Sequence, residues 1–284
     1  MNVRRAVITA AAPQQHTLPL QQLVDQQGSS KTALQLIVEE VIHAGVEEIC
    51  VIIQPGDEDE YRRAAGETAE RLLFVEQTEA RGYGHALLLA RDFVGEAPFL
   101  HLVGDHVYLS TAERRCAQQL IDVAVKHACS VSAVQATRET KLPYFGAVGG
   151  QLVQGRTDLY QVTNVLEKPT PTQAEQELIT AGLRAGYYLC FFGMHVLTHT
   201  VMQILADQLH SQTQPRVNLS TALAALAQRE KYLALELNGT RFDIGTKYGL
   251  LLAQLALALA GRDRDQILTE LIELTATGAV SRNR

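Results

Sequence analysis

The segment after the apolar run Leu72–Glu76 combines an amide side chain with closely spaced glycines. Gln77 is followed by Gly82 and Gly84, and the next residues have helical character. Glycine lets a backbone approach a flat ligand, and the Gln77 amide offers a donor and an acceptor for the edge of a pyrimidine base. The segment suits a base-binding site, although alone it is equally consistent with an ordinary strand-to-helix turn.

Two aspartates far apart in the sequence are candidates for a shared metal ion. Asp105 comes directly after the apolar run Phe99–Val103, and Asp243 stands between an aromatic residue and Ile244-Gly245. Mg²⁺ prefers oxygen ligands and bridges carboxylates to substrate phosphates, so this pair can hold the ion beside a nucleotide. Either aspartate alone is more often a helix cap or a turn residue.

Glu167, Lys168 and Pro169 form a third candidate. A carboxylate accepts hydrogen bonds from sugar hydroxyls, an ammonium group pairs with a sugar phosphate, and the following proline favours an extended backbone. A surface salt bridge is the favoured explanation of the tripeptide if it stands by itself.

Alternating strand and helix patterns are expected to position these residues. The predicted strands are Val3–Ala11, Glu48–Gln54, Leu72–Glu76, Phe99–Val103, Ser130–Ala136, Gly146–Gln151, Gln161–Glu167 and Tyr188–Leu197, and the predicted helices include Thr32–Ala44, Gly84–Arg91 and Ala112–His127. The pattern predicts an α/β fold with a doubly wound, mostly parallel, Rossmann-like mixed sheet and helices on both faces. Asp105 then lies at the carboxyl end of a strand, where open α/β sheets bind ligands.

The remaining segments are expected to be peripheral. Residues 170–185 are polar and predict a surface excursion, and Leu250–Ala260 and Gln266–Leu274 predict terminal helices used for packing or for contacts in a homo-oligomer. No repeat or linker divides the chain. We therefore expect one large domain over residues 1–260 and a helical extension over residues 261–284.

Composition limits the partners and the compartment. Apolar residues make up 46% of the chain, enough for a large core, and the net charge of −6 argues against binding to a nucleic acid polymer or an anionic membrane. No uncharged stretch reaches the roughly 18 residues of a membrane span. Four widely separated cysteines predict buried thiols, and the first apolar run is too short for a signal peptide. These features favour a cytoplasmic protein.

Several motifs together resemble those of the bacterial UTP:glucose-1-phosphate uridylyltransferase family of sugar-1-phosphate nucleotidyltransferases. The resemblance runs from about residue 3 to 260, in the order 6–8, 18–19, 39–49, 77–86, 105, 145–146, 167–168, 193 and 243–249. The segment Gln77 with Gly82–Ala86 is the most specific of these matches. This series of matches in the same order is hard to obtain by chance, although each match alone is weak.

The resemblance implies a role for each matching residue. It implies that Asp105 and Asp243 bind Mg²⁺ and that Lys168 and Asp105 are catalytic. The residues that it implies for nucleotide binding are Ala11, Ala12, Gln77, Gly82, Gly84 and His85. Those that it implies for binding the sugar and its phosphate are Gly146, Glu167, Lys168 and Gly193. The implied substrates are UTP and a hexose 1-phosphate, and the implied products are a UDP-sugar such as UDP-glucose and pyrophosphate.

The phosphate loop departs from the family pattern. Where that family has Gly-x-Gly-Thr-Arg, this chain has Ala12–His16, without either glycine or the arginine. His16 is therefore a third catalytic candidate, because a protonated His16 with Mg²⁺ can supply part of the missing charge. The family's following lysine is absent too, and Lys31 is a candidate substitute.

The first hypothesis is therefore an Mg²⁺-dependent uridylyltransferase with a degenerate phosphate loop. The alternative is a catalytically weak or inactive regulatory relative that binds nucleotide sugars, because losing one charge-stabilising donor typically costs about 10²- to 10³-fold in rate. An enzyme for another nucleotide or sugar is also open, because uracil and thymine present nearly the same edge.

Overall fold

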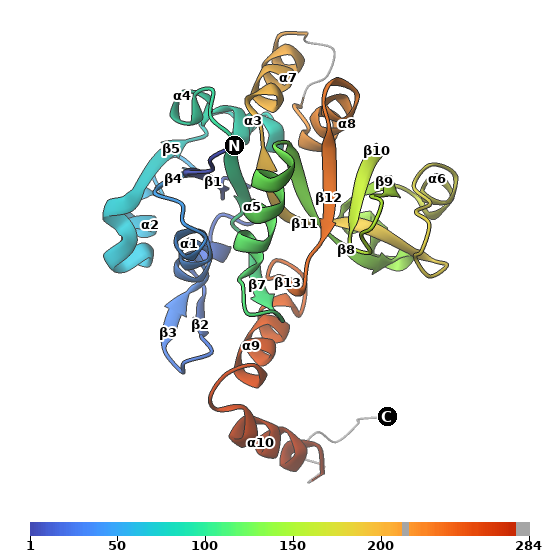
Figure 1. Ribbon diagram of the computed structural model, residues 1–284. Coiled ribbons are helices and arrows are strands. Elements are labelled where there is room, and N and C mark those ends of the chain that lie inside the picture. Colours follow the sequence, from blue (N-terminus) through green and yellow to red (C-terminus); the bar gives the residue numbers. More distant parts are fainter. Residues whose placement is uncertain (212–215, 277–284) are drawn as a thin grey trace.

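The protein, described as a computed structural model over residues 1–211 and 216–276, is built on a nine-stranded mixed sheet (Figure 1). The strand order is β5 (Leu72–Glu76), β4 (Glu48–Ile53), β1 (Arg5–Thr9), β6 (Phe99–Val103), β11 (Tyr187–Leu197), β8 (Ser130–Arg138), β12 (Tyr232–Glu236), β10 (Leu159–Glu167) and β9 (Gly146–Leu152). Two small antiparallel sheets lie beside it, β2 (Gln22–Val24) with β3 (Ser30–Thr32) and β7 (His106–Ser110) with β13 (Gly239–Asp243).

Helices cover both faces of the large sheet. One apolar cluster joins alternate residues of β1, such as Ala6 and Ile8, to α1 (Ala33–His43), α2 (Glu58–Ala65) and α5 (Cys116–His127). The opposite cluster joins Val7 to α3 (Tyr83–Leu88), α4 (Arg91–Val94), α7 (His199–His210) and α8 (Leu219–Arg229). Because successive side chains of a strand point to opposite faces, the apolar runs of β1 and β4 fill both clusters.

The expectation of a mostly parallel sheet is correct only for one half. Strands β5, β4, β1 and β6 are parallel, as is the pair β8 and β12, but β11 is antiparallel to both of its main neighbours and β10 is antiparallel to β12 and β9. Strands β9 and β10 are joined through residues 153–158 alone. A connection this short makes a hairpin, since a parallel crossover needs a dozen or more residues.

Short elements were placed less well by the sequence pattern. The helix expected from Ala112 begins at Cys116, after the unpredicted strand β7. The surface excursion at 170–185 contains α6 (Pro171–Glu177), which Thr170 caps by accepting from the backbone of Gln173. Short 3-10 turns cover Leu18–Leu20, Gly66–Arg71 and Glu139–Tyr144.

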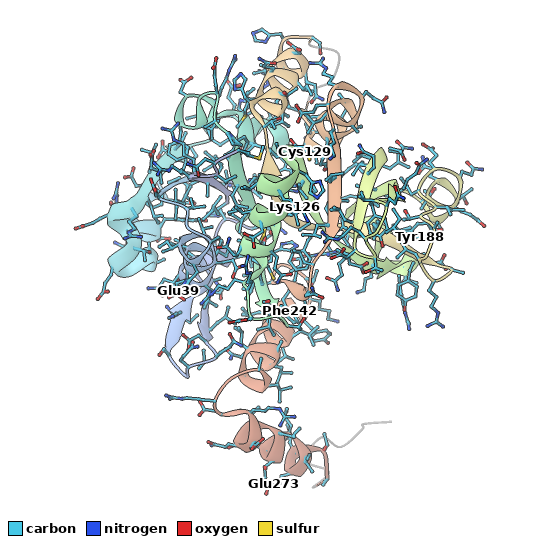
Figure 2. All side chains as sticks on the ribbon, in the orientation of Figure 1. Glu39, Lys126, Cys129, Tyr188, Phe242 and Glu273 are labelled. Atoms are coloured by element: carbon cyan, nitrogen blue, oxygen red, sulfur yellow. The ribbon has the colours of Figure 1, made fainter. Side chains whose placement is uncertain are left out.

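Two helices at the carboxyl end project from the body of the sheet (Figure 1). Helix α9 (Gly249–Leu259) packs through Ala253 and Leu257 against Leu23, Val107 and Ile244, whereas α10 (Arg264–Ala276) buries none of its residues. Figure 2 shows Phe242 where α9 meets the body, and Glu273 far from it on α10. The extension predicted beyond residue 260 thus contains α10, and 277–284 lie outside the described residues.

Two general expectations can be compared with the structure. All four cysteines are buried free thiols, as predicted. Among residues 1–211 and 216–276, no helix is long and apolar enough to cross a membrane.

Candidate functional site

A pocket of about 250 Å³ opens at the carboxyl ends of the parallel strands β1 and β6, beside the residue that follows β5. It is lined by Ala11, Ala12, Gln77, Gly82 and Asp105, five of the residues that the sequence singled out. Loops at the carboxyl ends of adjacent parallel strands converge on one sheet edge, which explains why segments distant in sequence meet here.

The loop around Gly82 is held in place by its neighbours. The Gln77 amide donates to the carbonyl of Gly82, 3.2 Å away, and Val217 N donates to Arg81 O at 2.8 Å. Gly82 has a φ of +106°, and an added β-carbon would lie 2.6 Å from the carbonyl oxygen of Val217. Glycine is therefore required here both by backbone conformation and by close approach.

Gly84 and His85 support the pocket but do not line it. A β-carbon at Gly84 would lie 2.8 Å from Leu205, so this glycine lets α3 pack closely on α7. The Nδ1 atom of His85 accepts a hydrogen bond from the Gln77 amide at 3.0 Å. Burial, together with the nearby Arg81, lowers the pKa of His85, which keeps it a neutral acceptor.

Tyr83 is a lining residue that the sequence analysis missed. Its hydroxyl donates to Nε2 of His101 at 2.6 Å, and Nδ1 of His101 donates to the carbonyl of Val7 at 3.0 Å. His101 is fully buried, and this burial lowers its pKa to about 4. A neutral imidazole therefore fixes the Tyr83 ring at the wall of the pocket.

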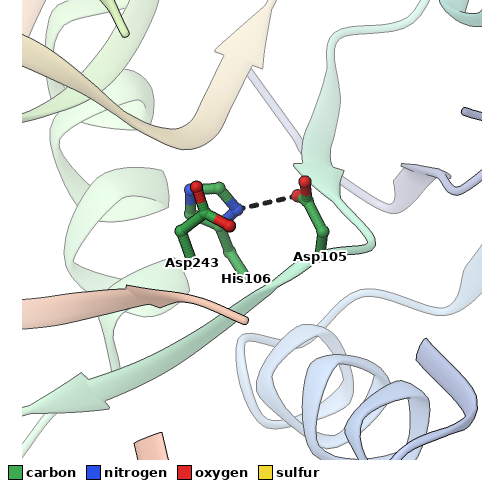
Figure 3. A group of neighbouring side chains, drawn as sticks. All are labelled: Asp105, His106 and Asp243. Atoms are coloured by element: carbon green, nitrogen blue, oxygen red, sulfur yellow. Dashed lines mark hydrogen bonds and ion pairs between the residues drawn. The ribbon is translucent and has the colours of Figure 1, made fainter. Parts of the chain in front are cut away.

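The two aspartates expected to share a metal lie side by side. Potential ligand atoms of Asp105, His106 and Asp243 are all within 4.8 Å of one another (Figure 3). Asp105 follows β6, and strand β13 brings Asp243 opposite His106 by antiparallel pairing with β7. The Nδ1 atom of His106 donates to Asp105 at 2.8 Å. His106 was not a sequence candidate.

The electrostatics of this cluster distinguish its two carboxylates. Burial opposes ionisation of Asp105, but the ion pair and hydrogen bond with His106 outweigh it and hold the pKa of Asp105 below its ordinary value. Burial, with a contribution from the Asp105 charge, raises the pKa of Asp243. Two close carboxylates with one imidazole are a donor set suited to a divalent cation.

A second pocket, of about 740 Å³, borders Asp243 on the other side of the cluster. Lys168 lines it, and this residue has a left-handed φ of +46°, a conformation that is uncommon for residues other than glycine and is often retained at functional sites. The preceding Glu167 accepts a hydrogen bond from Ser220 at the start of α8. A β-carbon on Gly146 would lie 3.1 Å from the Glu167 carboxylate, so Gly146 keeps this carboxylate uncrowded.

Gly193 lies behind the cluster of Asp105, His106 and Asp243. It has a φ of +80° within an irregular register of β11, and its carbonyl accepts from the hydroxyl of Tyr108 at 2.8 Å. A β-carbon there would meet Val103 at 2.8 Å and the ring of His106 at 3.3 Å. The residue lets β11 pass close to the cluster.

Both candidate substitutes for the missing phosphate-loop cations, His16 and Lys31, are paired with acidic residues. Nδ1 of His16 donates to Asp57 at 2.6 Å, and His16 lines neither of the two pockets described above. Lys31 pairs with Asp25 at 2.9 Å and with Glu39 at 2.6 Å. Neither side chain therefore takes the place of the loop arginine in this structure.

Other cations near the site were not sequence candidates, although Lys247 lies within the matching segment 243–249. They are Arg216 in the first pocket and Lys141, Arg241 and Lys247 in the second. Their positions depend on strand pairing and on loops far apart in the chain.

Comparisons with known proteins point to one family. The chain is 28% identical to the UTP–glucose-1-phosphate uridylyltransferase of Streptococcus pneumoniae serotype 4, covering 96% of each chain, and 28% identical to UTP–glucose-1-phosphate uridylyltransferase YngB of Bacillus subtilis, covering 95% of this chain and 94% of the relative. A solved UDP-glucose pyrophosphorylase complexed with UDP-glucose shares the fold, with a TM-score of 0.72 at 20% identity over 90% of this chain and 98% of that chain. A UTP-bound enzyme of Acinetobacter baumannii also has a TM-score of 0.72, at 20% identity over 95% of this chain and 99% of that chain. The family described as nucleotidyl transferase matches residues 17–258, beginning just after the divergent loop. With most of its length matched, the chain belongs to the nucleotidyl transferase family.

Proposed function

We propose that this protein is an Mg²⁺-dependent uridylyltransferase that makes UDP-glucose and pyrophosphate from UTP and glucose 1-phosphate. The observation that carries the proposal is the position of Asp105 and Asp243 between a pocket containing Gln77 and a pocket containing Lys168. This arrangement suits a nucleotide on one side and a sugar phosphate on the other. The named substrates follow the uridylyltransferases that the chain resembles.

The reaction needs no covalent enzyme intermediate. A non-bridging phosphate oxygen of glucose 1-phosphate forms a bond to the α-phosphorus of UTP. The bond from that phosphorus to the oxygen bridging to the β-phosphorus breaks, and pyrophosphate leaves with the electron pair. Catalysis then depends on positioning and on stabilising negative charge.

The chain's own side chains have distinct roles in this proposal. Gln77 and the backbone at Gly82 bind the uracil edge, Lys168 orients the attacking phosphate, and Glu167 accepts hydrogen bonds from sugar hydroxyls. Asp105 and Asp243 would hold Mg²⁺, whose oxygen preference fits two carboxylates within 4.8 Å. When bound, the ion neutralises phosphate charge.

The assembly and the compartment also belong to the proposal. Leu268, Ile272 and Leu274 are exposed on α10, which favours a homo-oligomer formed through the terminal helices. The free buried thiols favour the cytoplasm.

The test is pyrophosphate release by the purified protein with UTP, glucose 1-phosphate and Mg²⁺. We expect Asp105→Ala to lower the rate by about 10²-fold or more, because charge on the transferring phosphate loses its stabilisation. Asp59→Ala, at an exposed position on α2, is the matched control and should retain the wild-type rate. Wild-type release no faster than that of Asp105→Ala would reject catalysis.

A further inference from the structure

The second pocket carries a positive charge that the sugar phosphate alone does not explain. Four cations line it, Lys141, Lys168, Arg241 and Lys247, together with a single carboxylate, Asp243. Within residues 1–211 and 216–276, none of these four cations forms an ion pair. A concave site with this charge balance concentrates anions.

Arg241 is the most informative of the four. It is only 9% exposed, and its Nε atom has no hydrogen-bond partner. The guanidinium lies 4.1 Å from the ring centroid of Phe145 and 5.9 Å from that of Phe192, and it donates a long hydrogen bond of 3.4 Å to Gln135. Burial lowers the pKa of Arg241 to about 10, so it stays charged at neutral pH. A buried charge without a carboxylate partner is costly unless a ligand compensates it.

Two lysines extend this site toward solvent. Lys141 lies over the ring of Tyr144 at 5.7 Å and Lys247 over the ring of Tyr248 at 5.3 Å, and all four residues line the pocket. These aromatic contacts leave the ammonium groups available, because a cation over a ring keeps its hydrogen-bond donors for other partners.

The phosphate loop, residues 12–16, offers few groups that could bind phosphate in place of the second pocket. Pro13 has no N–H, and the N–H of Gln15 already donates to Ala12 O at 2.9 Å. His16 is paired with Asp57. Of the first pocket's described lining residues, only Arg216 is a cation, beside the Gly82 loop.

We propose that the second pocket binds the β- and γ-phosphates of the nucleoside triphosphate, and therefore the pyrophosphate that leaves, through Arg241, Lys141 and Lys247. This inference rests on the proposed function. Gln15 lines both pockets, so a triphosphate can pass from one to the other beside the aspartates. The volume, about 740 Å³ against about 250 Å³, leaves room for the sugar phosphate at Lys168 as well.

The test is calorimetric titration of the full chain with inorganic pyrophosphate, in buffer with excess MgCl₂. For a Lys141→Ala/Lys247→Ala double variant we expect the affinity for pyrophosphate to fall about 10-fold or more, since charge-assisted contacts are lost. Affinity for UMP should change less than about twofold. Lys126→Ala, on the exposed side of α5 (Figure 2), is the matched control and should bind pyrophosphate like the wild type.

Arg241→Gln should weaken pyrophosphate binding more than the double lysine variant does. A thermal melt shows whether Arg241→Gln folds. If it does not fold, the double lysine variant alone tests the proposal. Wild-type pyrophosphate affinity in the double variant would overturn the proposal. So would displacement of pyrophosphate by glucose 1-phosphate, because both phosphates would then share Lys168. These measurements report binding and not turnover. The inference about pyrophosphate binding can therefore fail while the protein still releases pyrophosphate from UTP, and it can hold even if the protein does not catalyse the reaction.

Discussion

The two pockets meet at the same pair of aspartates but present different chemistry to a ligand. The first is lined by small and apolar residues such as Ala11 and Ala12, by the Gln77 amide and by a single cation, Arg216. The second is lined by Lys168 and three further cations. In this chain most of the described cations near the aspartates therefore line the pocket that contains Lys168.

This contrast shows how a degenerate loop can coexist with an intact site. One wall of the first pocket is the loop around Gly82, and the contacts that hold this loop, from Gln77 and Val217, do not involve residues 12–16. Charge stabilisation is less tied to one segment, because electrostatic attraction acts over several ångströms and from any direction. Loss of the loop arginine therefore removes one source of charge without removing the base pocket.

The largest expected effect is on the pH dependence of the free energy of unfolding, and it depends on the buried residues beside each pocket. His101 lies behind the wall of the first pocket and is neutral, because burial lowers its pKa to about 4, whereas Arg241 lines the second pocket and stays charged. An unfolded histidine takes up a proton near pH 6.5, so the unfolded state binds more protons than the native state between pH 6.5 and 4. The free energy of unfolding should then fall as the pH is lowered through this window, by about 3 kcal/mol from this residue.

Urea denaturation at a series of pH values measures this slope. His101→Gln should flatten the dependence between pH 6.5 and 4, and His43→Gln, at an exposed position on α1, should leave it unchanged. His195, whose pKa is also lowered by burial, retains part of the slope. An identical slope in His101→Gln and wild type would mean that the buried imidazole is not the titrating group.

The next effect is a substitution that closes the first pocket and leaves the second intact. Gly82→Ala forces a left-handed φ on alanine and places its β-carbon 2.6 Å from Val217 O, so the loop must move. Displacement of a substrate-positioning group by about 1 Å can cost about 10²-fold, and we expect that loss in kcat/KM for UTP. Pyrophosphate affinity, measured by calorimetry, should be retained.

Gly155→Ala is the control for backbone strain. Gly155 has a φ of +77° but nothing within 4 Å of an added β-carbon. Equal losses of kcat/KM in the two variants would trace the effect to conformation alone and remove the evidence for a close-fitting base pocket.

The sequence predicted the parallel half of the fold well because its signals are local. The apolar run of β4 and the helical spacing of α1 each need only their own residues to be recognised. Strands β7 and β13 were missed because they are short and pair across more than a hundred residues. The same pairing brings Asp243 to Asp105, so their residue types suggested a metal pair and only the structure showed the convergence.

The charged residues of the site were harder to predict. The sequence offered His16 and Lys31 as substitutes for the loop cations, but their partners Asp57 and Glu39 are set by tertiary packing. Arg241 lies in a short strand with no motif of its own, and the lack of a hydrogen-bond partner for its buried Nε atom is visible only in three dimensions.

The smallest expected effect tests whether His16 of the phosphate loop contributes positive charge to the site. Because His16 donates to Asp57 and lines neither described pocket, His16→Gln should change the rate of pyrophosphate release and the KM for UTP by less than about threefold. A side chain that stabilises the transferring phosphate would instead cost about 10²- to 10³-fold. Asp57→Asn supplies the matching control, because it frees His16 without removing it. If His16→Gln loses a hundredfold while Asp57→Asn gains, His16 must turn into the site with substrate bound, and the loop retains a role in holding phosphate.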